Sequence, residues 1–269
     1  MSDLALNHYV CPLGYGVEGF LNDAVELGVG SVGLTRAALE EMPVSQLQKM
    51  LDGRGLSVSS LNSAGYFTFA DASRRAQQNN DSARLIDTAA QLGAGTLCVI
   101  TGGLEECASL GDARSRIADG LAHLDEQAAK AGVKLGLEPI HPVGMLSKGC
   151  INSIAQARET IGPLKATGLI LDLYHSWWDD DLLSALEEIP QRINLIQICN
   201  VILNEDAVPR RSTKLDQGRV DVPGFLNATR RAGYDGQFEF EIFARDHDGA
   251  NTRSILAHAV AAFDGWADA

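Results

Sequence analysis

The chain has 269 residues, 45% of them hydrophobic, and carries a formal net charge of −13. A chain of this length and apolar content can bury one large core, because α/β barrels of about 250 residues fold as single domains. No apolar run approaches the roughly 18 residues that a transmembrane helix needs, which argues against a membrane-spanning protein. The acidic charge also disfavours nucleic acid as a partner, since proteins that bind a duplex normally present basic side chains to its phosphates.

Cysteine usage and the N-terminal sequence predict a cytoplasmic protein. The five cysteines are odd in number and none forms a C-x-x-C pair, which is typical of reduced thiols rather than of a disulfide framework. The first residues, Met1-Ser2-Asp3-Leu4-Ala5, contain neither the basic nor the apolar segment of a signal peptide. We therefore expect free thiols and a cytoplasmic location.

Eight short apolar runs alternate along the chain with longer patterns of helical periodicity. The runs are rich in β-branched and aromatic residues, which is typical of parallel strands buried on both faces. The predicted strands are Leu6–Cys11, Ser31–Thr35, Ser57–Leu61, Thr96–Thr101, Lys134–Glu138, Gly168–Asp172, Ile193–Cys199 and Gln237–Phe243.

Amphipathic helices are predicted between these strands. The best-defined helices are Ser73–Leu92, Asp112–Ala131, Asp179–Ile189 and Asn251–Trp266, and the first two are followed directly by a glycine that can end a helix. Eight strand–helix units in one chain of this size favour a closed barrel over an open sheet. The sequence therefore predicts an α/β fold, a single-domain (β/α)8 TIM barrel over residues 1–269.

Polar side chains lie at the ends of the last four predicted strands. The fifth strand ends at Glu138 and the sixth at Asp172, while the seventh carries Gln197 and the eighth carries Glu241. Active sites of such barrels lie at this edge, so we expect the four side chains to converge. Three carboxylates brought together repel one another unless a cation lies between them. The alternative for any single acid is a salt-bridged strand end.

The four side chains offer oxygen ligands, which hard divalent cations prefer. We therefore predict a site for Mn²⁺ or Mg²⁺, with Co²⁺ as an alternative, held by Glu138, Asp172, Gln197 and Glu241. Such an ion would leave positions open for two substrate oxygens, polarise a carbonyl and stabilise an enediolate. Glu239 shares a face with Glu241, because strand residues two apart point the same way. It is expected to support the ligands or to belong to a buried polar layer.

Five further side chains are candidates for binding the substrate. His175 lies one turn beyond the sixth strand and is interpreted as a neutral donor to a substrate hydroxyl. His141 contacts the substrate or packs in its loop, and Lys148 binds a substrate carboxylate or phosphate or lies in solvent. Trp177 stacks on a sugar face or packs at a helix start. His8, after the first strand, lines the pocket or is structural.

The sequence resembles the xylose isomerase-like TIM-barrel superfamily, also described as the sugar phosphate isomerase/epimerase family, over nearly its whole length. The resemblance rests on four stretches: Glu138-Pro139-Ile140-His141-Pro142, Asp172-Leu173-Tyr174-His175-Ser176-Trp177-Trp178-Asp179, Gly218-Arg219-Val220-Asp221-Val222-Pro223, and Gly233-Tyr234-Asp235-Gly236 leading into Glu241-Ile242-Phe243. It implies that Glu138, Asp172 and Glu241 are metal ligands. It also implies that Glu138 and Glu241 act as acid and base on opposite sides of the substrate carbon, and that His175 contacts the substrate.

The chain departs from the commonest pattern of that family at three places. Gln197 stands where most relatives have a histidine ligand, although some branches with dehydratase-like members have glutamine there. Asn200 stands where an aspartate is usual. The arginine expected before the Gly218 loop is displaced, and Arg210 and Arg211 are the nearest residues of that type. Of the two, we take Arg211 as the candidate that binds the substrate.

These observations favour a metal-dependent ketose epimerase or aldose–ketose isomerase that acts on a small sugar or polyol-derived ketone. One of Glu138 and Glu241 would remove the proton beside the carbonyl and the other would return one. The alternative, raised by Gln197, is a dehydratase of the inosose or 3-dehydroshikimate type. A non-catalytic sugar-binding or partner subunit is disfavoured by the intact acid set. The sequence leaves the oligomeric state open, a homo-oligomer included.

Overall fold

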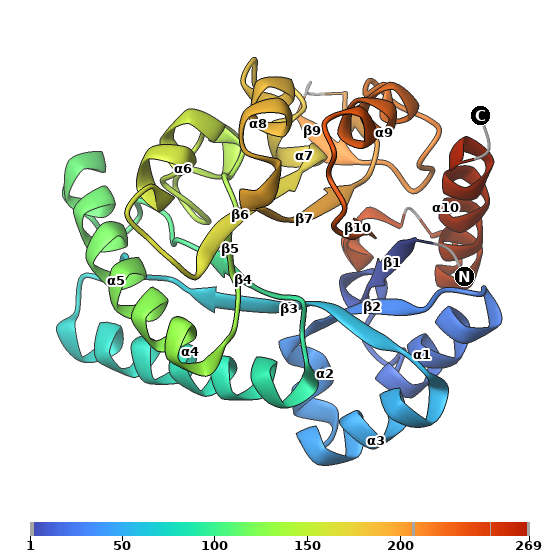
Figure 1. The fold of residues 1–269 in the computed structure, drawn as a ribbon, viewed down its shortest axis with the longest axis horizontal. Coiled ribbons are helices and arrows are strands. Elements are labelled where there is room, and N and C mark those ends of the chain that lie inside the picture. Colours follow the sequence, from blue (N-terminus) through green and yellow to red (C-terminus); the bar gives the residue numbers. More distant parts are fainter. Residues whose placement is uncertain (1–2, 206–207, 248, 268–269) are drawn as a thin grey trace.

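Eight parallel strands close into a barrel (Figure 1). The computed structural model describes residues 3–205, 208–247 and 249–267. Around the barrel the strand order is β1-β10-β7-β6-β5-β4-β3-β2, and each neighbouring pair is parallel. The strands are β1 (Leu4–Asn7), β2 (Ser31–Thr35), β3 (Ser57–Gly65), β4 (Thr96–Ile100), β5 (Leu135–Leu137), β6 (Thr167–Asp172), β7 (Ile193–Ile198) and β10 (Phe238–Phe240). The predicted (β/α)8 barrel is confirmed.

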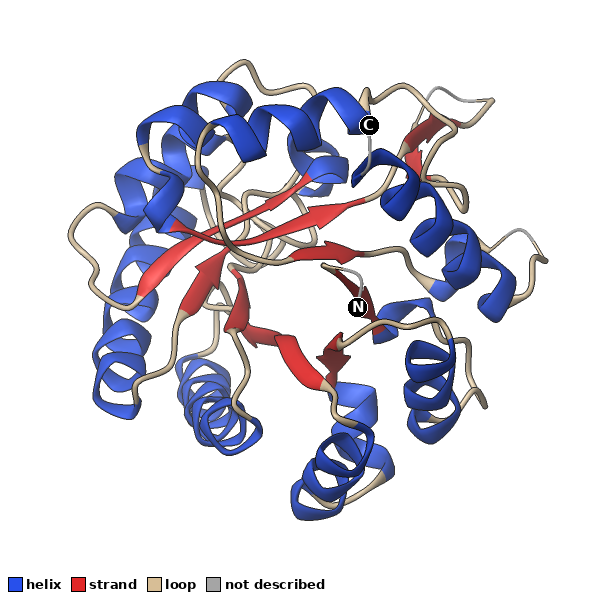
Figure 2. Cartoon of the chain, turned by 45° about the vertical axis from the view of Figure 1, so that its right-hand side comes forward, coloured by secondary structure: helices blue, strands red, loops and turns tan. Residues whose placement is uncertain are grey.

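Helices surround the barrel on its outside (Figure 2). They are α1 (Val17–Glu26), α2 (Arg36–Glu41), α3 (Val44–Arg54), α4 (Ala72–Leu92), α5 (Leu110–Ala131), α6 (Ile154–Ile161), α7 (Leu173–Ser176), α8 (Leu182–Glu188), α9 (Val222–Arg231) and α10 (Thr252–Ala267). The two long helices have caps at both ends. The side chains of Asp71 and Ser109 accept hydrogen bonds from the first turns of α4 and α5, and Gly93 and Gly132 end these helices in the left-handed conformation.

The predicted helix Asp179–Ile189 begins later than the sequence indicates. The structure has α8 at Leu182–Glu188, because the carboxylate of Asp179 bonds backbone amides outside that helix. It accepts from the amide of Ile154 at 2.8 Å and from that of Asp181 at 3.0 Å. Asp179 therefore joins the start of α6 to the chain that follows β6.

Two strands, β1 and β10, end well before their predicted ends, whereas β4, β5 and β7 each end one residue early. β1 ends at Asn7, because the side chain of Asn7 accepts a hydrogen bond from the amide of Tyr9 at 2.9 Å and begins a 3-10 turn. β10 ends at Phe240, because the amide of Phe243 donates to the carboxylate of Asp246 at 3.0 Å instead of to a neighbouring strand. In both places the chain turns across the mouth of the barrel after the strand ends.

A short antiparallel hairpin that the sequence did not predict follows β7. It consists of β8 (Val201–Leu203) and β9 (Pro209–Arg211), and Val201 pairs with Arg211. The hydroxyl of Tyr174 donates to the carbonyl of Pro209 at 2.9 Å, which fastens the hairpin to α7. The hairpin thereby brings an arginine to the C-terminal edge of the barrel.

The interior of the barrel changes from apolar to polar along the strands. Cys98, Ile170 and Leu195 form a buried apolar cluster inside the barrel, separate from the larger core beneath the helices. Two residues further along β7, the strand register pairs Gln197 with Asp172 of β6 on one side and with Glu239 of β10 on the other. Because residues two apart share a face, these polar side chains form a layer above the apolar cluster.

The remaining expectations about the chain as a whole concern membranes and thiols. Within the described ranges, no helix combines the length and the apolar content that crossing a membrane requires. The five cysteines are free, and Cys98, Cys150 and Cys199 are buried.

Candidate active site

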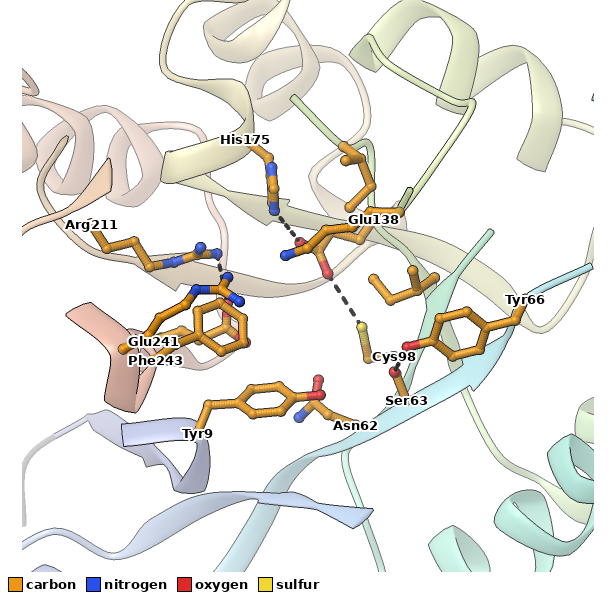
Figure 3. A pocket seen from close by; sticks show the side chains of 14 residues that line it. Tyr9, Asn62, Ser63, Tyr66, Cys98, Glu138, His175, Arg211, Glu241 and Phe243 are labelled. Carbon is orange, nitrogen blue, oxygen red and sulfur yellow. Dashed lines mark hydrogen bonds and ion pairs between the residues drawn. The ribbon is translucent and has the colours of Figure 1, made fainter. Parts of the chain in front are cut away.

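A cavity of about 220 Å³ opens at the C-terminal ends of the strands (Figure 3). This is the edge at which active sites of such barrels lie. Its lining residues come from the ends of strands on both sides of the barrel and include aromatic, cationic and acidic side chains. They are Tyr9, Asn62, Ser63, Tyr66, Cys98, Ile100, Glu138, Ile140, Lys148, His175, Arg211, Glu241, Phe243 and Arg245.

Two buried carboxylates, Glu138 and Glu241, line this cavity, and a third, Asp172, lies against its lining residue Arg211. Glu138, Asp172 and Glu241 are 4%, 0% and 3% exposed, although ionised side chains at such depth are costly without a cation. The guanidinium of Arg211 supplies one positive charge, because its Nη2 donates to Asp172 Oδ2 and, at 3.0 Å, to Glu241 Oε2. The sequence candidate Arg211 therefore lies between two of the predicted metal ligands.

Burial and mutual repulsion shift the pKa values of these acids upward. Burial and the neighbouring Asp172 carboxylate raise the pKa of Glu138 to about 7. Burial also raises the pKa of Asp172, and that of Glu241 well above its usual range, although Arg211 opposes both shifts. Conversely, Asp172 and Glu241 raise the pKa of the Arg211 guanidinium despite its burial. The site thus favours additional positive charge and can exchange protons near neutral pH.

His175 is a neutral hydrogen-bond donor in this arrangement. The backbone amide of His141 donates to its Nδ1 at 3.0 Å, so the proton of the neutral ring is on Nε2. Burial, followed by the charge of Arg211, lowers the pKa of His175 well below its ordinary value. The Nε2–H faces Glu138 Oε1 at 3.4 Å and Asp172 Oδ2 at 3.8 Å. The tautomer agrees with the interpretation of His175 as a neutral donor, and its contact with a substrate hydroxyl stays a prediction.

Glu239 lies in a buried layer of hydrogen bonds below the acids. It is fully buried, and its carboxylate accepts from Asn7 Nδ2 at 2.7 Å, from Ser60 Oγ at 2.8 Å and from Ser59 Oγ. Gln197 Nε2 is a fourth donor at 3.0 Å. The same Nε2 also donates to Glu241 Oε1 at 3.0 Å. Glu239 therefore belongs to the buried polar layer and holds the amide of Gln197.

The polar layer requires a glycine in β2. A Cβ added at Gly33 would overlap the carboxylate of Glu239 and crowd the amide of Asn7. Only a residue without a side chain leaves room there for Glu239 to accept its four hydrogen bonds. This packing could not be predicted from the sequence, because Gly33 lies within an otherwise ordinary strand.

The donor atoms fit a hard divalent cation. The amide nitrogen of Gln197 donates to both neighbouring carboxylates, Glu239 and Glu241. Gln197 Oε1 is therefore buried without a hydrogen-bond partner among the described residues. Together with the carboxylates of Asp172, Glu241 and Glu138, this amide oxygen would complete an all-oxygen ligand set of the kind that Mg²⁺ or Mn²⁺ prefers. Hydrogen bonds connect three of the four predicted ligands, since Arg211 bonds Asp172 and Glu241 and Gln197 bonds Glu241. Glu138 is near Asp172 and faces His175 instead.

A second grouping of potential ligands overlaps with this set. Among the described residues, Glu138, Asp172 and His175 each place one ligand atom within 4.8 Å of the other two. His175 Nε2 carries the proton while Nδ1 accepts from the His141 amide, so this nitrogen would have to lose its proton to bind a metal. The oxygen set with Gln197 needs no such change.

The remaining sequence candidates lie at different distances from the cavity. Lys148 lines it, whereas the ring of His141 lies against Tyr174 and Trp178 outside the lining. His8 is buried, hydrogen-bonds Thr35 through Nδ1 and contacts Phe20, away from the lining. Trp177 lies in a separate groove between α8 and α9. The structure does not bring Trp177 or His8 to the site.

Several lining residues were not predicted from the sequence. Tyr9 and Phe243, from the turns after β1 and β10, pack with ring centroids 4.7 Å apart. Tyr66 follows β3 with a φ of 59° and its hydroxyl lies 2.9 Å from Ser63 Oγ. Arg245 lies in the turn after Phe243 and also reaches the cavity. Reading the polar residues just beyond β1, β3 and β10 would have found most of them.

Comparisons with known proteins agree with this architecture. The family model described as xylose isomerase-like TIM barrel matches residues 21–263. The chain is similar to a solved structure of a protein from Sinorhizobium meliloti 1021, with 26% identity and a TM-score of 0.91 over 98% of both chains. It is also similar in fold to an IOLI protein with a bound zinc atom (17% identity, TM-score 0.82, 98% of both chains). An L-ribulose 3-epimerase is similar at 19% identity, with a TM-score of 0.80 over 98% of this chain and 94% of that one. No curated protein matches the chain.

Proposed function

Because the chain belongs to the xylose isomerase-like TIM barrel family, we propose that it is a divalent-metal-dependent enzyme that moves a proton beside the carbonyl of a sugar-like ketone. The reaction would be epimerisation of a ketose or interconversion of an aldose and a ketose. A relative in fold is named an L-ribulose 3-epimerase, which agrees with this class of reaction. The cytoplasmic location and the lack of a nucleic-acid partner stay predictions, and the oligomeric state stays open.

One observation carries the proposal: two buried carboxylates face the same cavity from well-separated strands. Glu138 follows β5 and Glu241 follows β10, and both line the cavity (Figure 3). Burial raises the pKa of both groups, which favours proton transfer near neutral pH. The ionised member of the pair removes a proton from the substrate carbon, and the protonated member returns one. The two transfers differ in face for an epimerase and in carbon for an isomerase.

The metal-binding part of the proposal rests on the oxygen donors. Glu138, Asp172, Glu241 and the unpartnered Oε1 of Gln197 would hold the ion. Bound there, a divalent cation would polarise the substrate carbonyl. This makes the proton on the adjacent carbon more acidic, so that a carboxylate can remove it.

Two further side chains bind and orient the substrate in this proposal. The Nε2–H of His175 points toward the acids and can donate to a substrate oxygen without carrying a charge. Arg211 is held by Asp172 and Glu241, so its charge is fixed in place before the substrate arrives. A fixed positive charge stabilises the negative charge that develops on oxygen when the proton leaves carbon.

The test is proton exchange with solvent. The protein is incubated in D₂O with Mn²⁺ or Mg²⁺ and a panel of ketoses, aldoses and cyclic ketones, and the products are analysed by NMR. Deuterium on the carbon beside the carbonyl, without loss of water, is the expected result. An alkene or enone product would replace the proposal with a dehydratase. An absence of exchange with every compound would contradict the proposal and favour a non-catalytic binding protein.

Two variants test the roles of the two carboxylates. Glu138→Gln and Glu241→Gln each keep a ligand oxygen but remove the basic carboxylate, so we expect each to reduce exchange by about a hundredfold or more. Their circular dichroism and urea unfolding should show an intact fold. Near-normal turnover in either variant would remove that residue from the acid–base pair.

A further inference from the structure

Three cationic side chains gather around one aromatic ring at the cavity. Lys148 Nζ lies 5.1 Å from the centroid of Phe243, and the Cζ atoms of Arg211 and Arg245 lie 4.7 and 4.5 Å from it. All four residues line the cavity. The cations therefore share one small region, although the chain as a whole has a net charge of −13.

Two of the three cations form no ion pair with an acid among the described residues. Arg211 is held by Asp172 and Glu241. The side chains of Lys148 and Arg245, in contrast, make no hydrogen bond or ion pair within the described part of the chain, and both lie over the Phe243 ring. A cation above an aromatic ring gains about 0.5–2 kcal/mol. That does not remove the repulsion between neighbouring cations. Burial, followed by the charges of Arg211 and Arg245, lowers the pKa of Lys148.

The charges around the cavity favour an anionic ligand. Its lining holds three cationic side chains and two carboxylates, Glu138 and Glu241. A third carboxylate, Asp172, is paired with Arg211, so the three cations and three acids balance, and a divalent metal would make the site positive. Converging positive side chains attract and orient anionic ligands. A lysine contributes a point charge, and an arginine a planar pair of donors that matches the oxygens of a carboxylate or phosphate.

We propose that the substrate carries an anionic group, a carboxylate or a phosphate monoester, that Lys148 and Arg245 bind at the mouth of the cavity. This rests on the proposed function and specifies its substrate class. Lys148 follows Glu138 in the loop after β5, and Arg245 follows Glu241 in the turn after β10. The anion-binding residues therefore come from the same two strand ends as the proposed acid and base. The cavity, at about 220 Å³, favours a substrate of the size of one sugar acid or sugar phosphate.

The experiment measures direct binding by calorimetry in the presence of Mg²⁺. The probes are a ketopentose, its terminal phosphate ester, a 2-keto sugar acid of the same length, and inorganic phosphate. At least one anionic sugar should bind about tenfold or more tightly than the neutral ketose, which is the effect of one charge-assisted contact. Comparing the ester with the acid decides between phosphate and carboxylate.

Variants assign the contact to the two cations. Lys148→Met and Arg245→Met should each weaken binding of the anionic sugar about tenfold, change binding of the neutral ketose less than twofold, and reduce the salt dependence of binding. Lys130→Met, the same change on an exposed lysine of α5, should have no effect. Arg245 is exposed, so its variant tests the site even if Lys148→Met disturbs its loop.

Two results would overturn the inference. One is equal affinity for neutral and anionic sugars; the other is an equal loss of affinity for both in the two variants. If neutral ketoses exchange protons with solvent and the protein does not prefer anionic sugars, the inference is wrong and the proposed function stands. If anionic sugars bind selectively but no compound exchanges protons, the anion-binding site stands and the proposed function is wrong.

Discussion

Gln197 and Glu239 lie directly opposite each other on β7 and β10, and the amide nitrogen of Gln197 donates to the carboxylate of Glu239 at 3.0 Å. Because an amide has one donating and one accepting end, this bond decides which end faces the acids. The nitrogen is directed to Glu239 and Glu241, and Oε1 is left without a partner among the described residues. Glu239 thus orients a proposed metal ligand and is not itself one of the proposed ligands.

The first prediction concerns Glu239→Gln. The variant replaces a carboxylate that accepts from four donors by an amide that has one accepting oxygen, so Gln197 loses its fixed orientation. We expect Mn²⁺ affinity to fall about 10- to 100-fold, which is typical when a group that holds a ligand is removed. Titration calorimetry on metal-stripped protein measures this. The control is Ser59→Ala, which removes one donor to Glu239 but leaves Gln197 bonded to it. This variant should bind Mn²⁺ as tightly as the wild type. A variant that is less stable but binds Mn²⁺ normally would limit Glu239 to a structural role.

The second prediction concerns Gln197→His. An amide oxygen is a hard, neutral and weak ligand, whereas an imidazole nitrogen binds later transition metals well. The wild-type site should therefore prefer Mg²⁺ or Mn²⁺ over Zn²⁺ more strongly than the variant, and the variant should bind Co²⁺ and Zn²⁺ more tightly. Competition titrations with a chromophoric chelator measure both affinities. Unchanged metal preference in the variant would indicate that Gln197 only bonds its neighbouring carboxylates, and that water completes the site.

The hydrophobic periodicity of the sequence predicted the barrel, because the strands are buried on both faces and the helices are buried on one face. The bounds of β2 agree with the prediction, since Ser31–Thr35 is a regular apolar run. The ends of β1 and β10 were placed too late, because side-chain hydrogen bonds from Asn7 and Asp246 end the strands within runs that remain apolar in sequence. The β8–β9 hairpin was missed because β9 is three residues long and begins with a proline.

The candidate site was partly predictable for a similar reason. A carboxylate inside an apolar strand is conspicuous, so Glu138, Asp172 and Glu241 were found from the sequence. Arg245 was not, because an arginine in a polar turn is ordinary and only the structure directs it into the cavity. Trp177 shows the opposite case: its place at a helix start does not tell which way the ring points, and the ring lies in another groove.

The third prediction concerns pH and the stability of the metal-free protein. The pKa of Glu138 rises from its ordinary 4.5 to about 7 on folding. Between these values the folded state holds a proton that the unfolded state has lost, so the free energy of unfolding falls as pH rises. At about 1.4 kcal/mol per pKa unit, the loss by pH 8 is on the order of 3 kcal/mol. Urea unfolding with a chelator, at several values from pH 5 to pH 8, measures it.

The matching variant for this pH dependence is Glu138→Gln. Its unfolding free energy should depend less on pH than that of the wild type, and it should be the more stable protein at pH 8 when metal is absent. Asp172 and Glu241 retain their raised pKa values, so part of the slope remains. Adding Mn²⁺ at pH 8 should stabilise the wild type, because the ion binds the ionised carboxylates of the folded state. Equal slopes for the two proteins would mean that Glu138 is not the group that titrates.

The last prediction separates binding from chemistry at His175. Its Nε2–H is a neutral donor directed at the acids, and its Nδ1 accepts from the backbone of the loop that carries His141. His175→Ala removes both interactions, whereas His175→Gln keeps a side chain with a donor and an acceptor. We expect His175→Ala to raise KM about tenfold, with a smaller effect on kcat, because one neutral hydrogen bond to the substrate contributes about 1 kcal/mol or somewhat more. His175→Gln should recover part of that loss. Steady-state kinetics on the substrate found by the exchange assay measure both parameters, and urea unfolding of the same variants checks the fold. A loss confined to kcat would instead make His175 a participant in proton transfer, and unchanged kinetics would leave it with only its contact to the His141 loop.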